Sequence, residues 1–205
     1  MIAIVGYGIG NLNSIRNMLN KIGVESAITS SEAEIRRARK LIMPGIGAFD
    51  AGMSRLTESG LIPVLTEKVL SEKTPVLGIC LGMQLMTRGS EEGRLPGLGW
   101  IGATTRRFDR ASDPTLKIPH MGWNVATPVK QSSLLRNCPE EPRFYFTHSY
   151  YVQCDDPADR LLTVGHGATC FDAGFEHDNL IGVQFHPEKS HRFGMWLLKN
   201  FADLY

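Results

Sequence analysis

The strongest structural signal in the chain is Pro75-Val76-Leu77-Gly78-Ile79-Cys80-Leu81-Gly82-Met83-Gln84-Leu85-Met86. A short apolar run meets a cysteine that has glycine two residues before it and two residues after it, and the apolar residues then change to helical spacing. This G-x-C-x-G pattern predicts a sharp turn from a buried strand into a helix, because a strained elbow needs small neighbours. Most unpaired cysteines are small buried hydrophobes. The glycine frame instead favours a reactive Cys80 at the start of a helix, whose dipole stabilises a thiolate.

A second stretch, near the C-terminus, supplies a candidate base. The residues Leu180-Ile181-Gly182-Val183-Gln184-Phe185 are typical of a strand and lead directly into His186-Pro187-Glu188. Alternation would place His186 and Glu188 on the same side of an extended segment, with Pro187 holding the backbone extended. Each residue alone is more often a loop histidine or a solvated carboxylate. Together with Cys80 they predict a nucleophile, a base and an acid that orients the base.

The chain order predicts an α/β fold. Expected strands at residues 2–5, 24–28 and 41–43 alternate with helices, and a helix over 12–22 follows the first strand. A Ser31-x-x-Glu34 capping box is expected to open a short polar helix, and residues 49–56 and 61–70 form two more helices. After residue 90, short alternating strands replace long helices. The prediction is an open, mostly parallel sheet flanked by helices, with antiparallel β additions in the C-terminal half.

The composition excludes several classes of function. The chain of 205 residues suits one domain and has 22 basic and 21 acidic residues, so no net field favours nucleic acid or an anionic membrane. The one basic cluster, residues 36–40, is expected to be a solvated helix end. The four cysteines form no C-x-x-C pair, so neither a disulfide framework nor a zinc site is indicated. No leader or membrane-spanning run is recognisable, and we expect a cytoplasmic protein.

The two chemical motifs resemble those of the triad-type (class I) glutamine amidotransferases. Within that class they are similar to the glutaminase subunits of imidazole glycerol phosphate synthase, and the similarity extends over the chain through residues 10–14, 44–47, 119–124 and 146–150. The resemblance implies a single, flavodoxin-like amidotransferase domain over residues 1–205. It implies hydrolysis of L-glutamine through a γ-glutamyl thioester, without a metal or cofactor. Ammonia would pass to a HisF-type (β/α)8 synthase subunit, the partner in a heterodimer of histidine biosynthesis.

The turn over residues 44–47 follows a buried strand, where open α/β sheets bind their ligands. We interpret it as half of an oxyanion hole, with the N–H of Leu81 as the other half, although an ordinary turn fits the residues equally well. By the resemblance, the oxyanion amides come from Ile46, Gly47 and Leu81. The resemblance implies glutamine contacts at Gly45, Gly47, Gln84, Glu92, His148, Ser149 and Tyr150. It implies partner contacts at Asn11, Asn13, Pro119, His120, Met121, Trp123 and Asn124, although a tryptophan such as Trp123 is more often core packing.

Three alternative functions remain open. The first is a paralogous glutaminase that serves a sugar-amidating enzyme of surface polysaccharide synthesis, which residues 188–195 resemble. The second is another α/β cysteine hydrolase such as a peptidase, against which Gln84 and residues 186–188 argue. The third is a non-catalytic nucleotide-binding module built on Gly6, Gly8 and Gly10. A dinucleotide fingerprint would require glycine at position 11, where the chain has Asn11.

Overall fold

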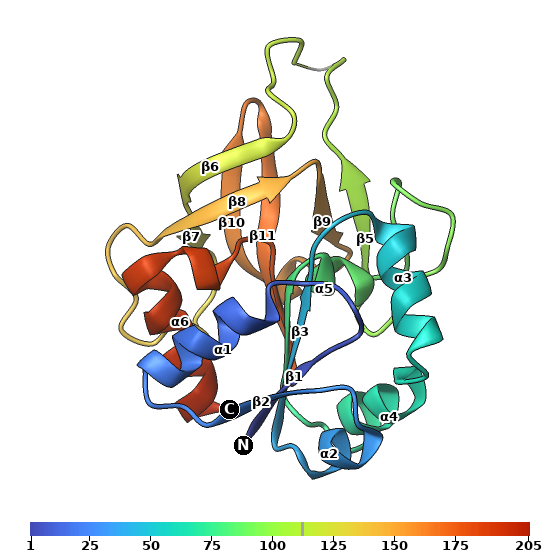
Figure 1. The fold of residues 1–205 in the computed structure, drawn as a ribbon. Coiled ribbons are helices and arrows are strands. Elements are labelled where there is room, and N and C mark those ends of the chain that lie inside the picture. The colour runs from blue at the N-terminus through green and yellow to red at the C-terminus, as the bar shows by residue number, and fades with distance from the viewer. Residues whose placement is uncertain (112) are drawn as a thin grey trace.

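The computed structural model of the chain describes residues 1–111 and 113–205. The half of the main sheet that contains the N-terminus is parallel, with the strand order β2-β1-β3-β4-β12 (Figure 1). Most residues of these strands are buried, as the apolar runs in the sequence predicted. The strands are β1 (Ile2–Val5), β2 (Ser26–Thr29), β3 (Lys40–Gly45), β4 (Val76–Cys80) and β12 (Leu180–Val183).

Helices cover both faces of the parallel strands. In Figure 1, α1 (Leu12–Lys21) and α6 (His191–Leu204) lie on one side of the sheet, and α2 (Glu32–Arg37), α3 (Phe49–Glu58) and α4 (Ile62–Thr66) lie on the other side. Two apolar cores follow from this layering. One packs Ile15 and Leu197 against the first face, and the other packs Ile35, Phe49 and Val64 against the second. The short helix α5 (Leu81–Leu85) begins directly after β4.

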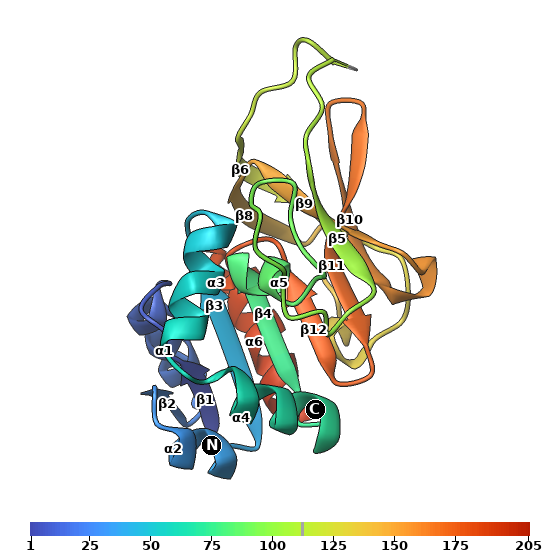
Figure 2. The ribbon, with the colours of Figure 1, turned by 90° about the vertical axis from the view of Figure 1, so that its right-hand side faces the viewer.

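Antiparallel strands extend the sheet beyond β12, toward the right-hand side of Figure 2. The order continues through β11 and β10 to β7, while β9 pairs with β11 and β5 pairs with β9. A separate antiparallel pair, β6 and β8, lies beside them. These strands are β5 (Ala103–Arg107), β6 (His120–Val125), β7 (Thr127–Pro128), β8 (Arg143–His148), β9 (Tyr150–Cys154), β10 (Arg160–His166) and β11 (Thr169–His177). The predicted fold class is confirmed.

Some local expectations were wrong. Ser31 does precede α2, but its hydroxyl makes no cap; its backbone N–H donates to Oγ1 of Thr29 instead, 2.9 Å away. The helix expected over 61–70 is α4 followed by a π-helical turn, Glu67–Ser71. Within the described residues, 3-10 turns also occur at Ser133–Leu135, Pro157–Asp159 and Pro187–Lys189. Apolar periodicity predicted the helices and strands but not these local departures from them.

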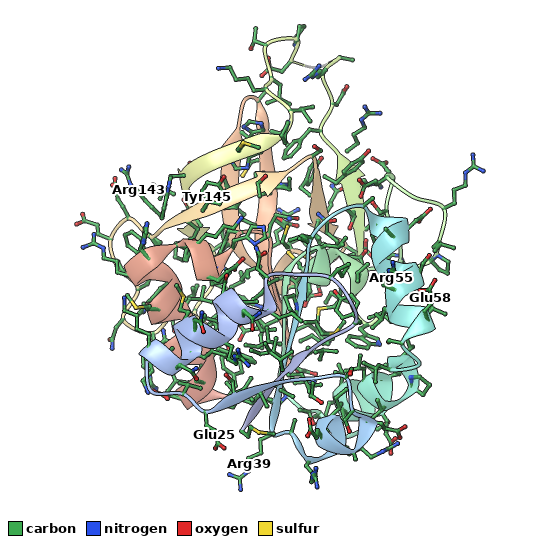
Figure 3. The ribbon with its side chains drawn as sticks, in the orientation of Figure 1. Glu25, Arg39, Arg55, Glu58, Arg143 and Tyr145 are labelled. Carbon is green, nitrogen blue, oxygen red and sulfur yellow. The ribbon has the colours of Figure 1, made fainter. Side chains whose placement is uncertain are left out.

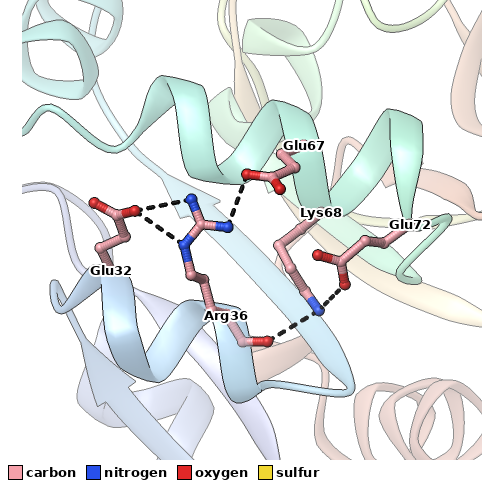
Figure 4. A network of polar contacts seen from close by, with 5 residues as sticks. All are labelled: Glu32, Arg36, Glu67, Lys68 and Glu72. Atoms are coloured by element: carbon pink, nitrogen blue, oxygen red, sulfur yellow. Dashed lines mark hydrogen bonds and ion pairs between the residues drawn. The ribbon is translucent and has the colours of Figure 1, made fainter.

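A polar network joins α2 to the π-helical turn (Figure 4). The guanidinium of Arg36, within the basic cluster, bonds to Glu32 at 2.9 Å and to Glu67 at 2.7 Å. Nζ of Lys68 reaches Glu72 at 2.5 Å and the carbonyl oxygen of Arg36 at 3.2 Å. The pairs of Arg36 are exposed and contribute little to stability. Because both carboxylates pair with Arg36, its charge is neutralised locally and is not available as part of a positive surface patch.

Candidate active site

The elbow between β4 and α5 has the predicted strain. Cys80 has φ of 54° and ψ of −111°, a region that residues with a side chain rarely adopt. A Cβ atom on Gly82 would lie 1.8 Å from the carbonyl oxygen of Met43, and one on Gly78 would lie 2.8 Å from Cα of Met83. Both glycines are therefore required by close backbone approach, Gly82 to the neighbouring strand β3 and Gly78 to α5. The elbow prediction is confirmed.

His186 reaches the same end of the sheet as Cys80 because β12 is the parallel neighbour of β4. Val183 pairs with Ile79, so the chain leaves both strands side by side. Nδ1 of His186 lies 2.8 Å from Oε1 of Glu188, and both side chains are almost fully buried. The expected extended backbone at Pro187 was wrong. Pro187 opens a 3-10 turn, which suits its fixed φ and brings Glu188 back beneath the imidazole.

The charge of His186 follows from its two neighbours. Burial lowers the pKa of this imidazole, but the interactions with Cys80 and with Glu188 raise it more, to about 10. Among the described residues, Nε2 of His186 has no hydrogen-bond partner of ordinary geometry. The Glu188 bond fixes the other nitrogen, so Nε2 is the atom available to exchange a proton with the cysteine.

Glu188 has a further contact that the sequence did not reveal. Nδ2 of Asn11 donates to Oε1 of Glu188 over 3.4 Å. Asn11 precedes α1 and was predicted to touch a partner subunit. The structure places it where it can hold the carboxylate that orients His186.

A cavity of about 380 Å³ opens over Cys80 and His186, a volume within the range of small-molecule sites. Most of the predicted glutamine and oxyanion residues line it. The wall consists of Ile46, Gly47, Cys80, Leu81, Gln84, Glu92, Pro119, Thr147, His148, Ser149, Tyr150 and His186. Gly45 is not among these residues; a Cβ there would lie 2.7 Å from N of Gly82, so this glycine packs against the elbow.

The turn after β3 has a glycine backbone conformation that can direct amide N–H groups toward the cavity, as an oxyanion hole requires. Gly47 has φ of +96° and lies at the cavity wall beside Ile46. No heavy atom among the described residues would lie within 4 Å of a Cβ on Gly47, so backbone conformation alone accounts for glycine. The assignment of these amides to an oxyanion remains a prediction.

Glu92 is anchored from a distant part of the chain. Its Oε2 accepts a hydrogen bond of 2.9 Å from the backbone N–H of Phe49, the first residue of α3. This contact holds the loop after α5 against the cavity. The predicted role of Glu92 toward glutamine is therefore compatible with its position, since the residue lines the wall.

Sequence reasoning missed two residues of the site. Gln184 is fully buried, and its Nε2 lies 3.6 Å from Sγ of Cys80. The signal was present, because Gln184 is a polar residue within an apolar strand run and lies two residues before His186. Thr147 lines the cavity without having stood out, since β8 is rich in polar residues.

The predicted partner contacts divide into two groups. Met121 and Trp123 are 63% and 47% exposed on β6, and Trp123 stacks on His191 with ring centroids 5.4 Å apart. Tyr145 of the paired strand lies nearby, labelled in Figure 3. Pro119 and Asn13 are also exposed and Asn124 is half-buried, whereas His120 is buried and 5% exposed. The alternation of β6 therefore places His120 inside the fold, away from the surface that carries Trp123.

The described ranges, 1–111 and 113–205, hold no group of three or more histidine, cysteine, aspartate or glutamate side chains placed to bind a metal ion. Nor do they contain a helix that is both long and apolar enough to span a membrane.

Comparisons with known proteins agree with this geometry. The family described as glutamine amidotransferase class-I matches residues 3–204. The subunit HisH 2 of imidazole glycerol phosphate synthase from Pseudomonas aeruginosa is 50% identical over 204 residues, which cover 100% of both chains. The protein of the same name from Methanococcus maripaludis is 53% identical over 201 residues, 98% of both chains.

Solved structures share the fold at low identity. A structure described as a glutamine amidotransferase matches with a TM-score of 0.74 and 15% identity, covering 98% of this chain and 99% of that one. A putative GMP synthase protein from Thermoplasma acidophilum matches with a TM-score of 0.72 and 21% identity, covering 98% and 91%. The family match, the identity of the relatives and the cysteine elbow lead to the same conclusion: the chain belongs to the class-I glutamine amidotransferase family.

Proposed function

We propose that this chain is the glutaminase subunit of an imidazole glycerol phosphate synthase, which hydrolyses L-glutamine to glutamate and ammonia. The observation that carries the proposal is that the strained Cys80 and His186 line one cavity, with Glu188 bonded to the far nitrogen of His186. The full-length identity with two subunits named HisH 2 supports the same reaction and the same acceptor pathway.

The geometry supports a two-step mechanism at the carboxamide carbon of glutamine. Nε2 of His186 takes the proton of the Cys80 thiol, and Sγ attacks that carbon as a thiolate. Backbone amides at Gly47 and Leu81 stabilise the tetrahedral oxyanion. His186 then gives its proton to the departing nitrogen, and ammonia leaves a γ-glutamyl thioester on Cys80.

Water completes the cycle. His186, now neutral, takes a proton from a water molecule that attacks the thioester carbon. The carbon–sulfur bond breaks, glutamate is released and the proton returns the site to its starting state. Glu188 keeps Nδ1 of His186 occupied throughout and stabilises the imidazolium. Every step uses residues of this chain and needs no further group.

A glutaminase that releases ammonia needs an acceptor, and we propose that its partner in a heterodimer is a HisF-type (β/α)8 synthase subunit. The exposed side chains of Met121 and Trp123 on β6 offer an apolar contact surface. This surface lies near the cavity, because Pro119, just before β6, is part of the cavity wall. Aromatic and methionine side chains are typical of the centre of protein interfaces. The four free cysteines suit a reducing compartment, and we propose the cytoplasm.

A second candidate keeps the chemistry and changes the acceptor. The names of the Pseudomonas and Methanococcus relatives both carry the number 2, as names of duplicated subunits do. A duplicated glutaminase could supply ammonia to a sugar-amidating enzyme instead. The catalytic residues would be the same, so only the partner separates the two candidates.

The deciding experiment measures glutamate release from L-glutamine by the wild type and by Cys80→Ala. Each is assayed alone, with a purified HisF-type subunit plus its nucleotide ligand, and with a sugar-amidating enzyme. Release that requires Cys80 and rises with the HisF-type subunit supports the proposal. Release that rises only with the sugar-amidating enzyme supports the second candidate, and the absence of Cys80-dependent release in every pairing would refute both.

A further inference from the structure

A row of buried polar groups begins at the sulfur of Cys80. Nε2 of Gln184 lies 3.6 Å from Sγ, a distance that suits an N–H donor and the large sulfur atom. Oε1 of Gln184 lies 3.0 Å from Nε2 of Gln84, and the same nitrogen of Gln84 lies 3.2 Å from the carbonyl oxygen of Tyr150. Gln84 and Gln184 are both buried, so each amide depends on these contacts.

The row continues through two histidines to the outer strand β6. Nδ1 of His148 lies 2.7 Å from the carbonyl oxygen of Tyr150, and its Nε2 lies 3.0 Å from Nδ1 of His120. Nε2 of His120 lies 3.4 Å from Nδ2 of Asn124, which also donates to the carbonyl oxygen of Gly165 over 3.1 Å. Five side chains thus connect the surface strand to the nucleophile.

The carbonyl oxygen of Tyr150 determines the direction of every bond in the row. A carbonyl oxygen can only accept, so Nδ1 of His148 and Nε2 of Gln84 must both carry the hydrogens. Because the nitrogen of Gln84 donates, its contact on Gln184 must be the oxygen. The opposite end of the Gln184 amide, the NH2 group, therefore faces Sγ of Cys80.

The same reasoning determines which ring nitrogens of the two histidines carry hydrogens. With Nδ1 of His148 protonated, its Nε2 accepts from Nδ1–H of His120, and Nε2 of His120 accepts from Asn124. A further proton on either ring would break one of these bonds. Burial, the largest cause, lowers the pKa of His148 to about 3 and that of His120 to about 4. Both rings are neutral at pH 7, and His148 has no free nitrogen with which to act as a base.

We propose that Gln184 is a further catalytic residue: its amide N–H donates to the sulfur of Cys80 and stabilises the thiolate. Gln84, Tyr150 and the His148–His120 pair are positioning groups that fix the direction of this amide. The inference rests on the proposed glutaminase function. Gln184 transfers no proton; the thiol proton resides on His186, and the amide keeps both of its hydrogens.

The physical reason lies in the burial of the sulfur. Cys80 is 7% exposed, so water reaches a thiolate there poorly and its charge must be stabilised by the protein. His186 supplies a positive charge, and a hydrogen bond to the charged form adds to it. An amide of fixed direction loses little conformational freedom when it makes that bond, whereas a freely rotating amide would lose more.

The test is Gln184→Glu, which preserves the side-chain length and the acceptor for Gln84 but replaces the NH2 donor by an acceptor. The probe is alkylation of Cys80 by iodoacetamide, which reacts with thiolates, followed by mass spectrometry on the peptide that contains Cys80. We expect the alkylation rate at pH 7 to fall at least about 10-fold, and the pH of half-maximal rate to rise by about one unit. Glutamate release should lose kcat by about 10-fold or more, while KM changes by less than about 3-fold.

Gln131→Glu is the control, because it adds the same charge at an exposed loop position. It should leave the alkylation profile unchanged. If Gln184→Glu does not fold, Gln184→Met removes the donor without a charge and is judged by the same profile. A folded Gln184 variant with the wild-type alkylation profile would overturn the inference. Absence of Cys80-dependent glutamate release by the wild type would instead refute the proposed function, and the two failures are therefore distinct.

Discussion

Nδ1 of His186 and Oε1 of Glu188 lie 2.8 Å apart in a buried pair that a single proline separates along the chain. The pair is formed by a 3-10 turn, so its geometry depends on only a few backbone angles. Its consequence is electrostatic: Cys80 and Glu188 together raise the pKa of His186 to about 10 against the effect of burial. The two neighbours therefore favour the protonated imidazole over the neutral one.

Glu188→Gln should lower the pKa of His186 and reduce catalysis. The amide keeps an acceptor for Nδ1 but removes the negative charge that stabilises the imidazolium. We expect a fall in kcat for glutamate release of about 100-fold or more. An NMR titration of the His186 ring measures the pKa directly. Glu141→Gln, at an exposed carboxylate, is the control, and an unchanged pKa of His186 in Glu188→Gln would contradict the assignment.

The neutral histidine pair should make the protein sensitive to acid. The folded pKa values of His120 and His148, about 4 and about 3, lie below the unfolded value of 6.5. The unfolded state therefore binds more protons between these values, and the stability that is full above pH 6.5 is lost as pH falls. Each histidine contributes a slope of up to about 1.4 kcal/mol per pH unit.

Urea unfolding at pH 7 and at pH 5 measures this slope. His120→Asn should make the free energy of unfolding less dependent on pH over that interval. His191→Asn is the matched control, since His191 is exposed and has φ of 46°, which asparagine tolerates. Equal pH slopes for the wild type and His120→Asn would refute the prediction.

The exposed ring of Trp123 should act in partner binding and not in stability. It is 47% exposed, with one face stacked on His191 and with the Tyr145 ring at its edge. Trp123→Ala should raise the Kd for a HisF-type subunit by about 10- to 100-fold, as truncation of a central aromatic does. Calorimetric titration measures the affinity. Val129→Ala removes another exposed apolar side chain and should bind normally; normal binding by Trp123→Ala would exclude β6 from the interface.

Much of the site could be predicted because its strongest signals are local. The glycines around Cys80 indicated the elbow. The structure explains them, because a Cβ atom at Gly78 or Gly82 would clash with the neighbouring backbone. The alternation of parallel strands and helices was also readable from apolar periodicity. These features depend on residues close in sequence, which is the information that a single chain displays directly.

The contacts that the sequence did not reveal join distant segments. Asn11 and Glu188 are 177 residues apart, and Gln84 and Gln184 are 100 residues apart. His120 looked like a surface residue beside Trp123, yet the alternation of β6 turns it inward onto His148. Such pairings depend on strand register, which a single sequence determines poorly in the antiparallel half.

Gly82→Ala should be among the most destabilising glycine-to-alanine substitutions in the chain. The new Cβ would lie 1.8 Å from the carbonyl oxygen of Met43, a backbone atom held within β3. Because β3 pairs with both β1 and β4, the oxygen cannot move without displacing the centre of the sheet. We expect a loss of at least about 3 kcal/mol in the free energy of unfolding.

Gly165→Ala is the matched comparison for this substitution. Among the described residues no heavy atom lies within 4 Å of its added Cβ, and its φ is outside the left-handed region. The change should alter stability by no more than about 1 kcal/mol. Urea unfolding of both variants measures the difference. Equal free energies of unfolding for Gly82→Ala and Gly165→Ala would contradict the prediction. They would mean that β3 and α5 can move apart without loss of stability, and that their close approach at the elbow is not essential to the fold.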